Sequence, residues 1–494
     1  MIRRICIGLL AVIAWPVGAQ HPLPPITARD RVVIVAPHPD DEVLGASGAI
    51  QQALAAGADV RVVYLTNGDH NQIAFKLYRG RVHLTARQYI AFGELRQREA
   101  IAATSLLGLP ADHLTFLGYP DWGTLRIWRD YWNPVRPFRS DATQRAGVPY
   151  ENAFRQYSPY TAANIAADLT DVLRRLEPTR VFVTHPADSN PDHRAAASFT
   201  RLAVLQLAAE GKAPAVYFYL VHFGGWTRPL GYHPELELQP PRVLLDNGEW
   251  MTLSLTAAQT AAKYDAILQN RTQLTIGRRF LFSLARANEL FATLATPPVR
   301  MVPPDAPLDW RKAVKMKGLR VPAYPTSEKT VEEAAEKEPE IIDLNETMLL
   351  RQGNDLIAQI DLRNRLGKRT GVHLFLYGVQ RDVDFATLPK IRVKISPLGG
   401  LYVYDNRQRL RDHGVTVVSV ADRFFVRVPL RLLGGDSLDH LFVSARAHFG
   451  EIPPDDTAWR LFPLESPAAP RTNWSSAKSV LSGASKAVTS HRTP

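Results

Sequence analysis

The chain has 494 residues, of which 46% are hydrophobic, so it is long enough to form two or three domains. Its formal net charge of +11 favours anionic partners, but no motif typical of nucleic-acid binding accompanies that charge, and we expect no nucleic-acid partner. A single cysteine, Cys6, excludes a disulfide framework.

The N-terminal residues predict a secretory signal peptide over residues 1–19. A basic stretch at 1–4 precedes an apolar stretch at 5–15, and small residues lead to Ala19, where we expect cleavage. The apolar stretch is too short to cross a bilayer comfortably, and no later apolar run reaches about 18 residues. The sequence therefore predicts a bacterial protein that is periplasmic or secreted, with no transmembrane segment after cleavage.

Two short β-branched runs each end in a cluster of ionisable residues. The run at 32–36 predicts a buried strand that leads into His38, Asp40 and Asp41, and the run at 180–184 predicts another. The second run leads into His185, Asp188, Asn190, Asp192 and His193. Because the carboxyl ends of parallel strands meet at one edge of a sheet, the two clusters are predicted to form one site.

The residue types in these clusters fit a hydrolytic metal site. Zinc in such a site takes three imidazole or carboxylate ligands and keeps one position for water, and His38, Asp41 and His193 can supply this set. Asp40, beside a ligand, suits a general base, because zinc lowers the pKa of its water to about 7. The alternative is a pair of solvated loops in which aspartates such as Asp192 only cap helices.

Strand and helix patterns alternate through the first half of the chain. Helices are expected at 45–57 and 158–176, and further strands at 60–65 and 215–221. This alternation predicts an α/β fold with a Rossmann-like parallel sheet and helices on both faces. No GxGxxG motif follows the first strand, which argues against a dinucleotide cofactor.

Several segments resemble motifs of one known family. Residues 36–42, APHPDDE, resemble the signature of the zinc-dependent de-N-acetylases of the PIG-L and LmbE type, which remove acetyl groups from N-acetylglucosamine units. Further matches follow in the family's order at 96–100, 107–108, 116–121 and 190–193. An ordered set of this kind is more specific than a single motif, and we expect the deacetylase domain over residues 28–296.

The resemblance implies a role for each matching residue. His38, Asp41 and His193 would bind zinc or another divalent ion, and Asp40 would act as the general base. Substrate contacts are implied for Arg96, Asp121 and Asp192.

One position departs from the family's pattern. The family commonly has a histidine where this chain has Asn190. An amide can donate a hydrogen bond to an oxyanion, but it cannot deliver a proton to the leaving amine. That proton would come from Asp40 after it is protonated, or from His185.

The sequence thus predicts a zinc-dependent hydrolase that removes the N-acetyl group from an N-acetylglucosamine-containing glycan or glycoconjugate. The basic charge adds the expectation of an anionic glycan or glycolipid. Two alternatives stay open: a hydrolase of another N-acyl sugar, and a non-catalytic glycan-binding or envelope-assembly protein on the same fold.

Residues 119–160 combine many aromatic side chains with arginines. They either line a substrate cleft, with rings stacked on sugars, or form a local aromatic core. The aromatic residues are Trp122, Trp128, Tyr131, Trp132, Phe138, Tyr150 and Tyr157.

The second half of the chain differs from the first in composition and in its predicted elements. Prolines and glutamates predict a linker over 297–342. Alternating strand patterns beyond it predict a smaller, β-sandwich-like accessory domain over 343–465. The basic Ser-, Ala- and Pro-rich segment 466–494 is expected to be a disordered tail.

Overall fold

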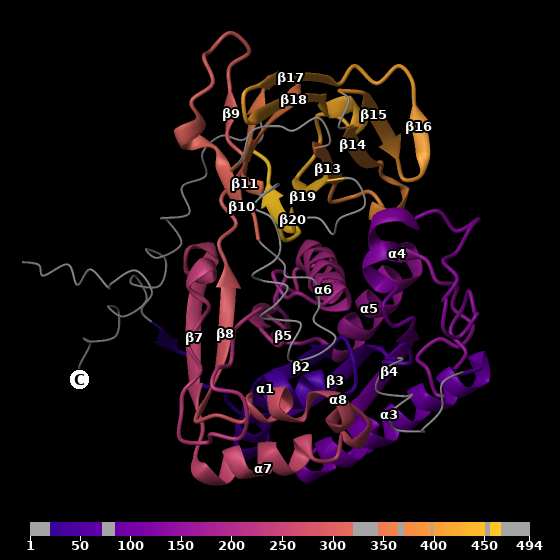
Figure 1. Cartoon of the computed structure of the whole chain (residues 1–494), viewed down its shortest axis with the longest axis vertical. Helices are drawn as coiled ribbons and strands as arrows, with labels where there is room; N and C mark the ends of the chain where they lie inside the picture. The colour runs from indigo at the N-terminus through magenta and orange to yellow at the C-terminus, as the bar shows by residue number, and fades with distance from the viewer. Residues whose placement is uncertain are drawn as a thin grey trace, which may run out of the picture.

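The computed structural model describes residues 20–71, 84–319, 344–363, 370–396, 399–449 and 455–465. Figure 1 shows helices around one large sheet in the N-terminal half of the chain. The sheets of the C-terminal half lie beside this N-terminal half. The predicted signal peptide (1–19) and basic tail (466–494) lie outside the described residues. Within the described ranges, no helix is long and apolar enough to cross a membrane.

The N-terminal domain contains an eight-stranded sheet with the order β1-β7-β8-β6-β5-β2-β3-β4. Five neighbouring strands are parallel: β2 (Arg31–Ala36), β3 (Asp59–Thr66), β4 (Leu114–Tyr119), β5 (Arg180–Thr184) and β6 (Ala215–Tyr219). The remaining strands are β1 (His21–Pro22), β7 (Gly248–Ser254) and β8 (Asn288–Leu294).

The sheet is mixed, which corrects the prediction of a parallel sheet. Strand β8 runs antiparallel to both β6 and β7, so the parallel arrangement is confirmed for β2 to β6 but not for the whole sheet; at its edge, β1 pairs in parallel with β7. No strand was predicted in 222–296, where β7 and β8 lie. Both strands carry polar residues such as Glu249 and Glu289, and therefore lack the continuous apolar run that marks a buried parallel strand.

Helices cover both faces of this sheet, as predicted. One group contains α1 (Asp41–Ala55), α3 (Ala86–Leu106), α7 (Ala257–Ile267) and α8 (Arg271–Phe282), and the other contains α4 (Thr124–Asp130), α5 (Ala162–Leu176) and α6 (Pro191–Ala209). Short 3-10 helices are η1 (Ala111–His113), η2 (Arg242–Asn247), η3 (Trp310–Lys312), η4 (Phe385–Thr387) and η5 (Leu430–Leu432).

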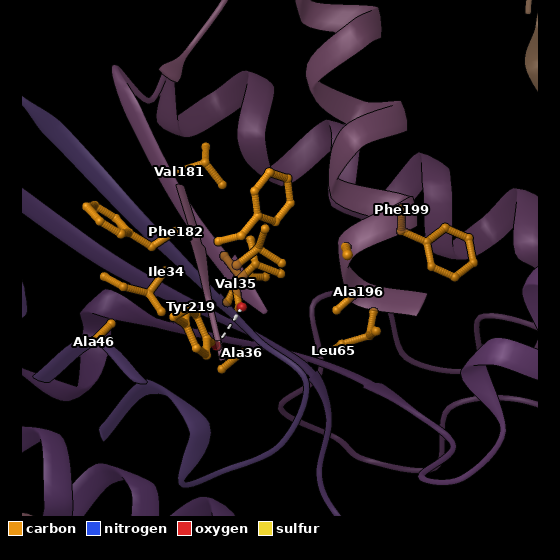
Figure 2. Close-up of a cluster of buried hydrophobic side chains, with 14 of the residues drawn as sticks. Ile34, Val35, Ala36, Ala46, Leu65, Val181, Phe182, Ala196, Phe199 and Tyr219 are labelled. Carbon is orange, nitrogen blue, oxygen red and sulfur yellow. Dashed lines mark hydrogen bonds between the residues drawn. The ribbon is translucent and has the colours of Figure 1, made fainter. Parts of the chain in front are cut away.

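The core below the carboxyl ends of β2 and β5 is apolar and closely packed. Figure 2 shows the side chains of both strands between the helices, with the Tyr219 hydroxyl donating a hydrogen bond to the Val35 carbonyl at 3.1 Å. The Tyr219 ring lies so close to Gly45 that a Cβ there would come within 2.1 Å of it. This packing holds the two strand ends and the start of α1 in one rigid arrangement.

The C-terminal half contains two sheets that share a hydrophobic core. The six-stranded sheet consists of β9 (Met301–Val302), β10 (Val314–Lys317), β11 (Leu344–Gln352), β12 (Asp355–Leu362), β17 (Thr416–Val420) and β18 (Arg423–Pro429). The seven-stranded sheet consists of β13 (Thr370–Val379), β14 (Lys390–Ile395), β15 (Leu401–Asp405), β16 (Gln408–Leu410), β19 (His440–Phe449), β20 (Asp455–Asp456) and β21 (Arg460–Pro463).

The predicted linker boundary needs correction. Strands β9 and β10 lie inside 297–342, yet both pair with β11 in the six-stranded sheet. Val314 and Met316 of β10 are buried in the C-terminal core. The alternation of Val314, Lys315, Met316 and Lys317 is a strand pattern that the surrounding prolines and charges obscured.

The two domains meet through a continuous apolar contact. The Trp128 ring of α4 lies 5.1 Å from the Phe442 ring of β19 and 5.6 Å from the Trp459 ring, measured between centroids. Phe442, Trp459 and Tyr377 belong to the same buried cluster as the N-terminal core. The C-terminal domain is therefore packed against the N-terminal domain as part of one core.

Candidate active site

The carboxyl ends of β2 and β5 bring the two predicted clusters together, as expected. His38 and Asp41 follow β2, and His193 lies in the first turn of α6 after β5. Their facing atoms form a small triangle: His38 Nδ1 and His193 Nε2 each lie 3.1 Å from Asp41 Oδ2, and 3.3 Å from each other. All three side chains are buried.

This triangle fits a metal ion of the size of zinc. Ligand atoms about 2.0–2.1 Å from a tetrahedral zinc ion lie roughly 3.3 Å from one another, which is the separation observed here. The donor set of two imidazoles and one carboxylate is also typical of zinc. Within the described residues, His38, Asp41 and His193 therefore form a group that can hold a metal ion.

Each imidazole of the triangle is backed by a carboxylate on its other nitrogen. His193 Nδ1 lies 3.1 Å from Asp188 Oδ2, and His38 Nε2 lies 3.1 Å from Asp121 Oδ1. Such outer partners fix the orientation of metal-binding histidines and raise their basicity. Asp188 was not predicted as a site residue; its position in the cluster after β5 was the available signal.

A second group of His38, Asp121 and Asp192 also has the spacing of metal ligands. The carboxylate of Asp192 is already engaged: it accepts hydrogen bonds from the Trp122 amide at 2.6 Å, the Thr124 amide at 3.0 Å and the Thr124 hydroxyl. We assign this group to holding His38. Asp121 and Asp192 are thus partners of His38, and their contact with substrate stays a prediction.

The capping alternative for these aspartates is wrong. The residue that caps α6 is Asn190, whose side-chain oxygen accepts the Asp192 amide at 2.8 Å. Asp40 precedes α1 but its side chain makes no capping bond, and its backbone has a φ of 130°, which side chains rarely adopt. The Asp40 carboxylate therefore remains available for chemistry.

The predicted general base lies beside the triangle in a buried setting. Burial raises the pKa of the Asp40 carboxyl to about 7, although the neighbouring Arg96 guanidinium opposes this shift. The two groups are 3.2 Å apart, from Asp40 Oδ2 to Arg96 Nη2. A carboxylate with a pKa near neutrality is suited to accepting and returning a proton.

The guanidinium of Arg96 holds two loops of the site together. Its guanidinium is buried and donates to the Gly68 carbonyl at 3.0 Å and to the Pro39 carbonyl at 2.6 Å, as well as facing Asp40. A Cβ at Gly68 would lie 1.8 Å from this guanidinium, so the loop after β3 needs glycine here. Arg96 therefore ties two loops together beside Asp40, and its predicted contact with substrate stays a prediction.

His185 is not brought to the triangle. Its Nδ1 accepts the Ala187 amide at 3.0 Å, and its ring stacks on Trp250 with centroids 5.7 Å apart. Burial lowers the pKa of this imidazole to about 3, and Arg460 contributes to the shift. Of the two residues predicted to deliver the proton, Asp40 is therefore the one that lies beside the triangle, and its role stays a prediction.

A third histidine, His222, lies near the triangle and was missed. Its ring centroid is 5.0 Å from that of His193, and its backbone amide donates to Asp188 Oδ2 at 2.9 Å. His222 follows β6, the next parallel strand in the sheet. The predicted strand at 215–221 ends directly before it, so the position of His222 after that strand was the signal.

The aromatic segment 119–160 is mostly core. Trp128, Trp132 and Tyr150 are fully buried, which favours the local-core alternative for them. Two rings differ: Tyr157 is 74% exposed, and Trp122 is 41% exposed next to the site. The Trp122 amide donates a hydrogen bond to Asp192, so this partly exposed residue lies at the site, and a contact of its ring with substrate stays a prediction.

Comparison with known proteins agrees with the geometry. Residues 33–204 match the model of the PIG-L family, described as GlcNAc-PI de-N-acetylase, so the chain contains a domain of this family. A curated relative from Tsukamurella paurometabola, named 1D-myo-inositol 2-acetamido-2-deoxy-alpha-D-glucopyranoside deacetylase, is 33% identical over 192 residues, which cover 37% of this chain and 57% of the relative. The chain thus spans little more than half the length of the curated relatives that it matches.

Two solved structures are also similar. N,N'-diacetylchitobiose deacetylase from Pyrococcus horikoshii is 20% identical, with a TM-score of 0.33, over 53% of this chain and 82% of that one. The zinc inhibited form of teicoplanin deacetylase is 17% identical, with a TM-score of 0.34, over 53% of this chain and 96% of that one.

Proposed function

We propose that this protein is a zinc-dependent hydrolase that removes the N-acetyl group from an N-acetylglucosamine-containing glycan or glycoconjugate. The observation that carries the proposal is the triangle of His38, Asp41 and His193, with Asp188 and Asp121 behind its imidazoles, inside a PIG-L domain. The curated relatives are named as deacetylases of an acetamido sugar, which supports the reaction type.

The metal, held by the triangle, would supply an activated water and polarise the amide carbonyl. Asp40 takes a proton from the attacking water and returns it to the departing amine, because its pKa of about 7 allows both directions near neutral pH. Arg96 holds the Asp40 carboxylate in place for these transfers.

Asn190 serves as a hydrogen-bond donor to the carbonyl oxygen of the substrate. Its side-chain oxygen is committed to capping α6, so the remaining group of its amide is the NH2 donor. Loss of one such donor typically lowers the rate by about 10²–10³-fold. Asn190 therefore replaces the oxyanion-stabilising part of the family's histidine, and Asp40 replaces its acid function.

We place the enzyme outside the cytoplasm, in the periplasm or the medium of a bacterium. The support is the signal-peptide pattern of residues 1–19. The formal charge of +11 fits an anionic glycan or glycolipid as the larger substrate.

The test is acetate release by the purified protein from monomeric and oligomeric N-acetylglucosamine, after chelation and after zinc is restored. We expect release only with zinc, and we expect Asp40→Asn to keep zinc but lose about 10²–10⁴-fold in turnover. Asp112→Asn, an exposed carboxylate in η1, is the control and should behave as wild type.

Other outcomes separate the alternatives. Full turnover in Asp40→Asn would reject this residue as the base. Zinc bound at one equivalent without acetate release from any N-acetylated glycan would favour a non-catalytic glycan-binding or envelope-assembly protein. Release of a different acyl group would identify a hydrolase of another N-acyl sugar.

A further inference from the structure

The residue after the metal-binding His193 links the two domains. Arg194 is buried at the start of α6, and its Nε donates to the Asp188 carbonyl at 2.6 Å. Its Nη1 donates to Asp456 Oδ1 at 2.5 Å, and Asp456 belongs to β20 of the C-terminal domain. One guanidinium thus connects the loop between β5 and α6 with a carboxylate from the other domain.

Asp188, whose carbonyl accepts this bond from Arg194, also orients His193, the proposed metal ligand. Asp188 Oδ2 lies 3.1 Å from His193 Nδ1 and accepts the backbone amides of Val221 at 3.1 Å and His222 at 2.9 Å. Asp188 Oδ1 accepts the Asn190 amide at 2.9 Å. The side chain of Asp188 is held by these amides, and Arg194 holds its backbone carbonyl.

Asp456 is itself fixed in space. Strand β20 pairs with β19, with Asp456 opposite Arg446, and the Asp456 carbonyl accepts the Leu319 amide at 3.1 Å. The apolar contact between the domains adds a rigid surface beside it, because rings of both domains lie in one buried cluster. These contacts therefore fix the position of the Asp456 carboxylate relative to Arg194.

We propose that Asp456 is a positioning residue for the metal site and that the C-terminal domain, which lies outside the family match at 33–204, completes that site. Asp456 keeps Arg194 in its buried position, and Arg194 keeps Asp188 directed at His193. The inference rests on the proposed metal site but not on the identity of the substrate.

The physical reason is the cost of an unpaired buried charge. A guanidinium that loses its carboxylate inside a protein is strongly destabilised and moves toward water or shifts its hydrogen bonds. Either movement releases the Asp188 carbonyl, and the loop that presents Asp188 to His193 becomes looser. Loss of an outer partner of a metal-binding histidine typically weakens metal affinity about 10–100-fold.

The test is zinc affinity in the full chain, measured by competition with a chromophoric chelator. We expect Asp456→Asn to weaken zinc binding about 3–10-fold, less than the loss for a direct partner because the effect passes through Arg194. The visible absorption spectrum of the cobalt(II) protein should shift as well, since it reports the geometry of the ligands.

The matched control is Arg392→Gln. Arg392 and Asp130 form another ion pair between the domains, at 3.1 Å, which joins β14 to the last residue of α4. This variant should lower the melting temperature without changing zinc affinity or the cobalt spectrum. If both variants weaken zinc binding equally, the effect is general loosening of the interface and the proposal is overturned.

A second variant keeps the test decisive if Asp456→Asn does not fold. Arg194→Lys retains a positive charge for Asp456. A lysine ammonium lacks the fork of donors with which the guanidinium reaches both Asp456 and the Asp188 carbonyl. We expect weaker zinc binding here too, and wild-type affinity would reject the proposal. These measurements need no substrate, so a failure to find deacetylase activity would leave their result standing.

Discussion

The protein buries charge in two places, and the sign of that charge differs between them. Around the ends of β2 and β5, the buried charged side chains are mostly carboxylates: Asp40, Asp41, Asp121, Asp188 and Asp192, with the guanidiniums of Arg96 and Arg194 beside them. At the contact between the domains, the buried charged side chains include three arginines: Arg194, Arg201 and Arg460.

The two groups of buried charges also differ in their interaction partners. The carboxylates at the strand ends converge on imidazoles and leave negative charge that a metal cation would balance. Arg201 and Arg460 have no carboxylate within ion-pair distance in the part of the chain that the structure describes; they donate to the carbonyls of Leu461 at 3.0 Å and Ala295 at 2.6 Å. The aspartates at the strand ends are therefore arranged to hold a cation, whereas the arginines between the domains join segments of the chain.

The largest effect on zinc binding is expected when a proposed metal ligand is removed. His193→Ala should weaken zinc binding by more than about 100-fold, beyond the range for an outer partner, because the triangle loses one of its three donors. Zinc content after dialysis measures the effect. A variant that keeps one equivalent of zinc would show that the strand-end cluster is not the metal site.

Removal of an outer partner is the next test. Asp188→Asn should lower zinc affinity about 10–100-fold, because His193 loses the carboxylate that orients it and raises its basicity. Chelator competition measures the change. An affinity equal to that of the wild type would mean that the amides around Asp188, rather than its charge, set the geometry.

Zinc affinity should also rise with pH. Burial lowers the pKa of His193, but the carboxylates of Asp188 and Asp41 outweigh it and raise the pKa to about 9 in the metal-free protein. Below that pH, zinc must displace a proton from this ring, so the apparent affinity falls about tenfold per pH unit for each proton displaced. Titrations between about pH 6 and pH 9.5 should show this slope and its loss at the upper end; a flat profile would contradict it.

The smallest effect is expected at the contact between the domains. Burial and the neighbouring Arg460 lower the pKa of Arg201 to about 9, so its charge is unfavourable where it lies. Arg201→Met removes that charge together with one hydrogen bond, and the free energy of unfolding should change by less than about 1 kcal/mol. Denaturant unfolding measures this value, and zinc affinity should stay unchanged. A loss of zinc affinity in Arg201→Met would show that Arg201 also supports the metal site.

Much of the fold and of the site was predictable, since the signals were local. The β-branched runs at 32–36 and 180–184 are strands that end at the predicted residues, Ala36 and Thr184, and parallel pairing brings their ends together. The sequence could not indicate the direction of Arg96, which points into the protein behind Asp40. An arginine on a helix has the same local pattern whether it faces a substrate or a neighbouring loop.

The residue types at the ends of the two buried strands could be read from short segments, because strand periodicity and the positions of His38, Asp41 and His193 are local properties of the chain. Long-range packing sets which carboxylate lies behind each imidazole, the antiparallel direction of β8 beside β6, and the contact of Asp456 with Arg194 across 262 positions of the chain. Several aspartates carried equal local signals, and the choice among them depends on how distant segments pack, which no short stretch of sequence encodes.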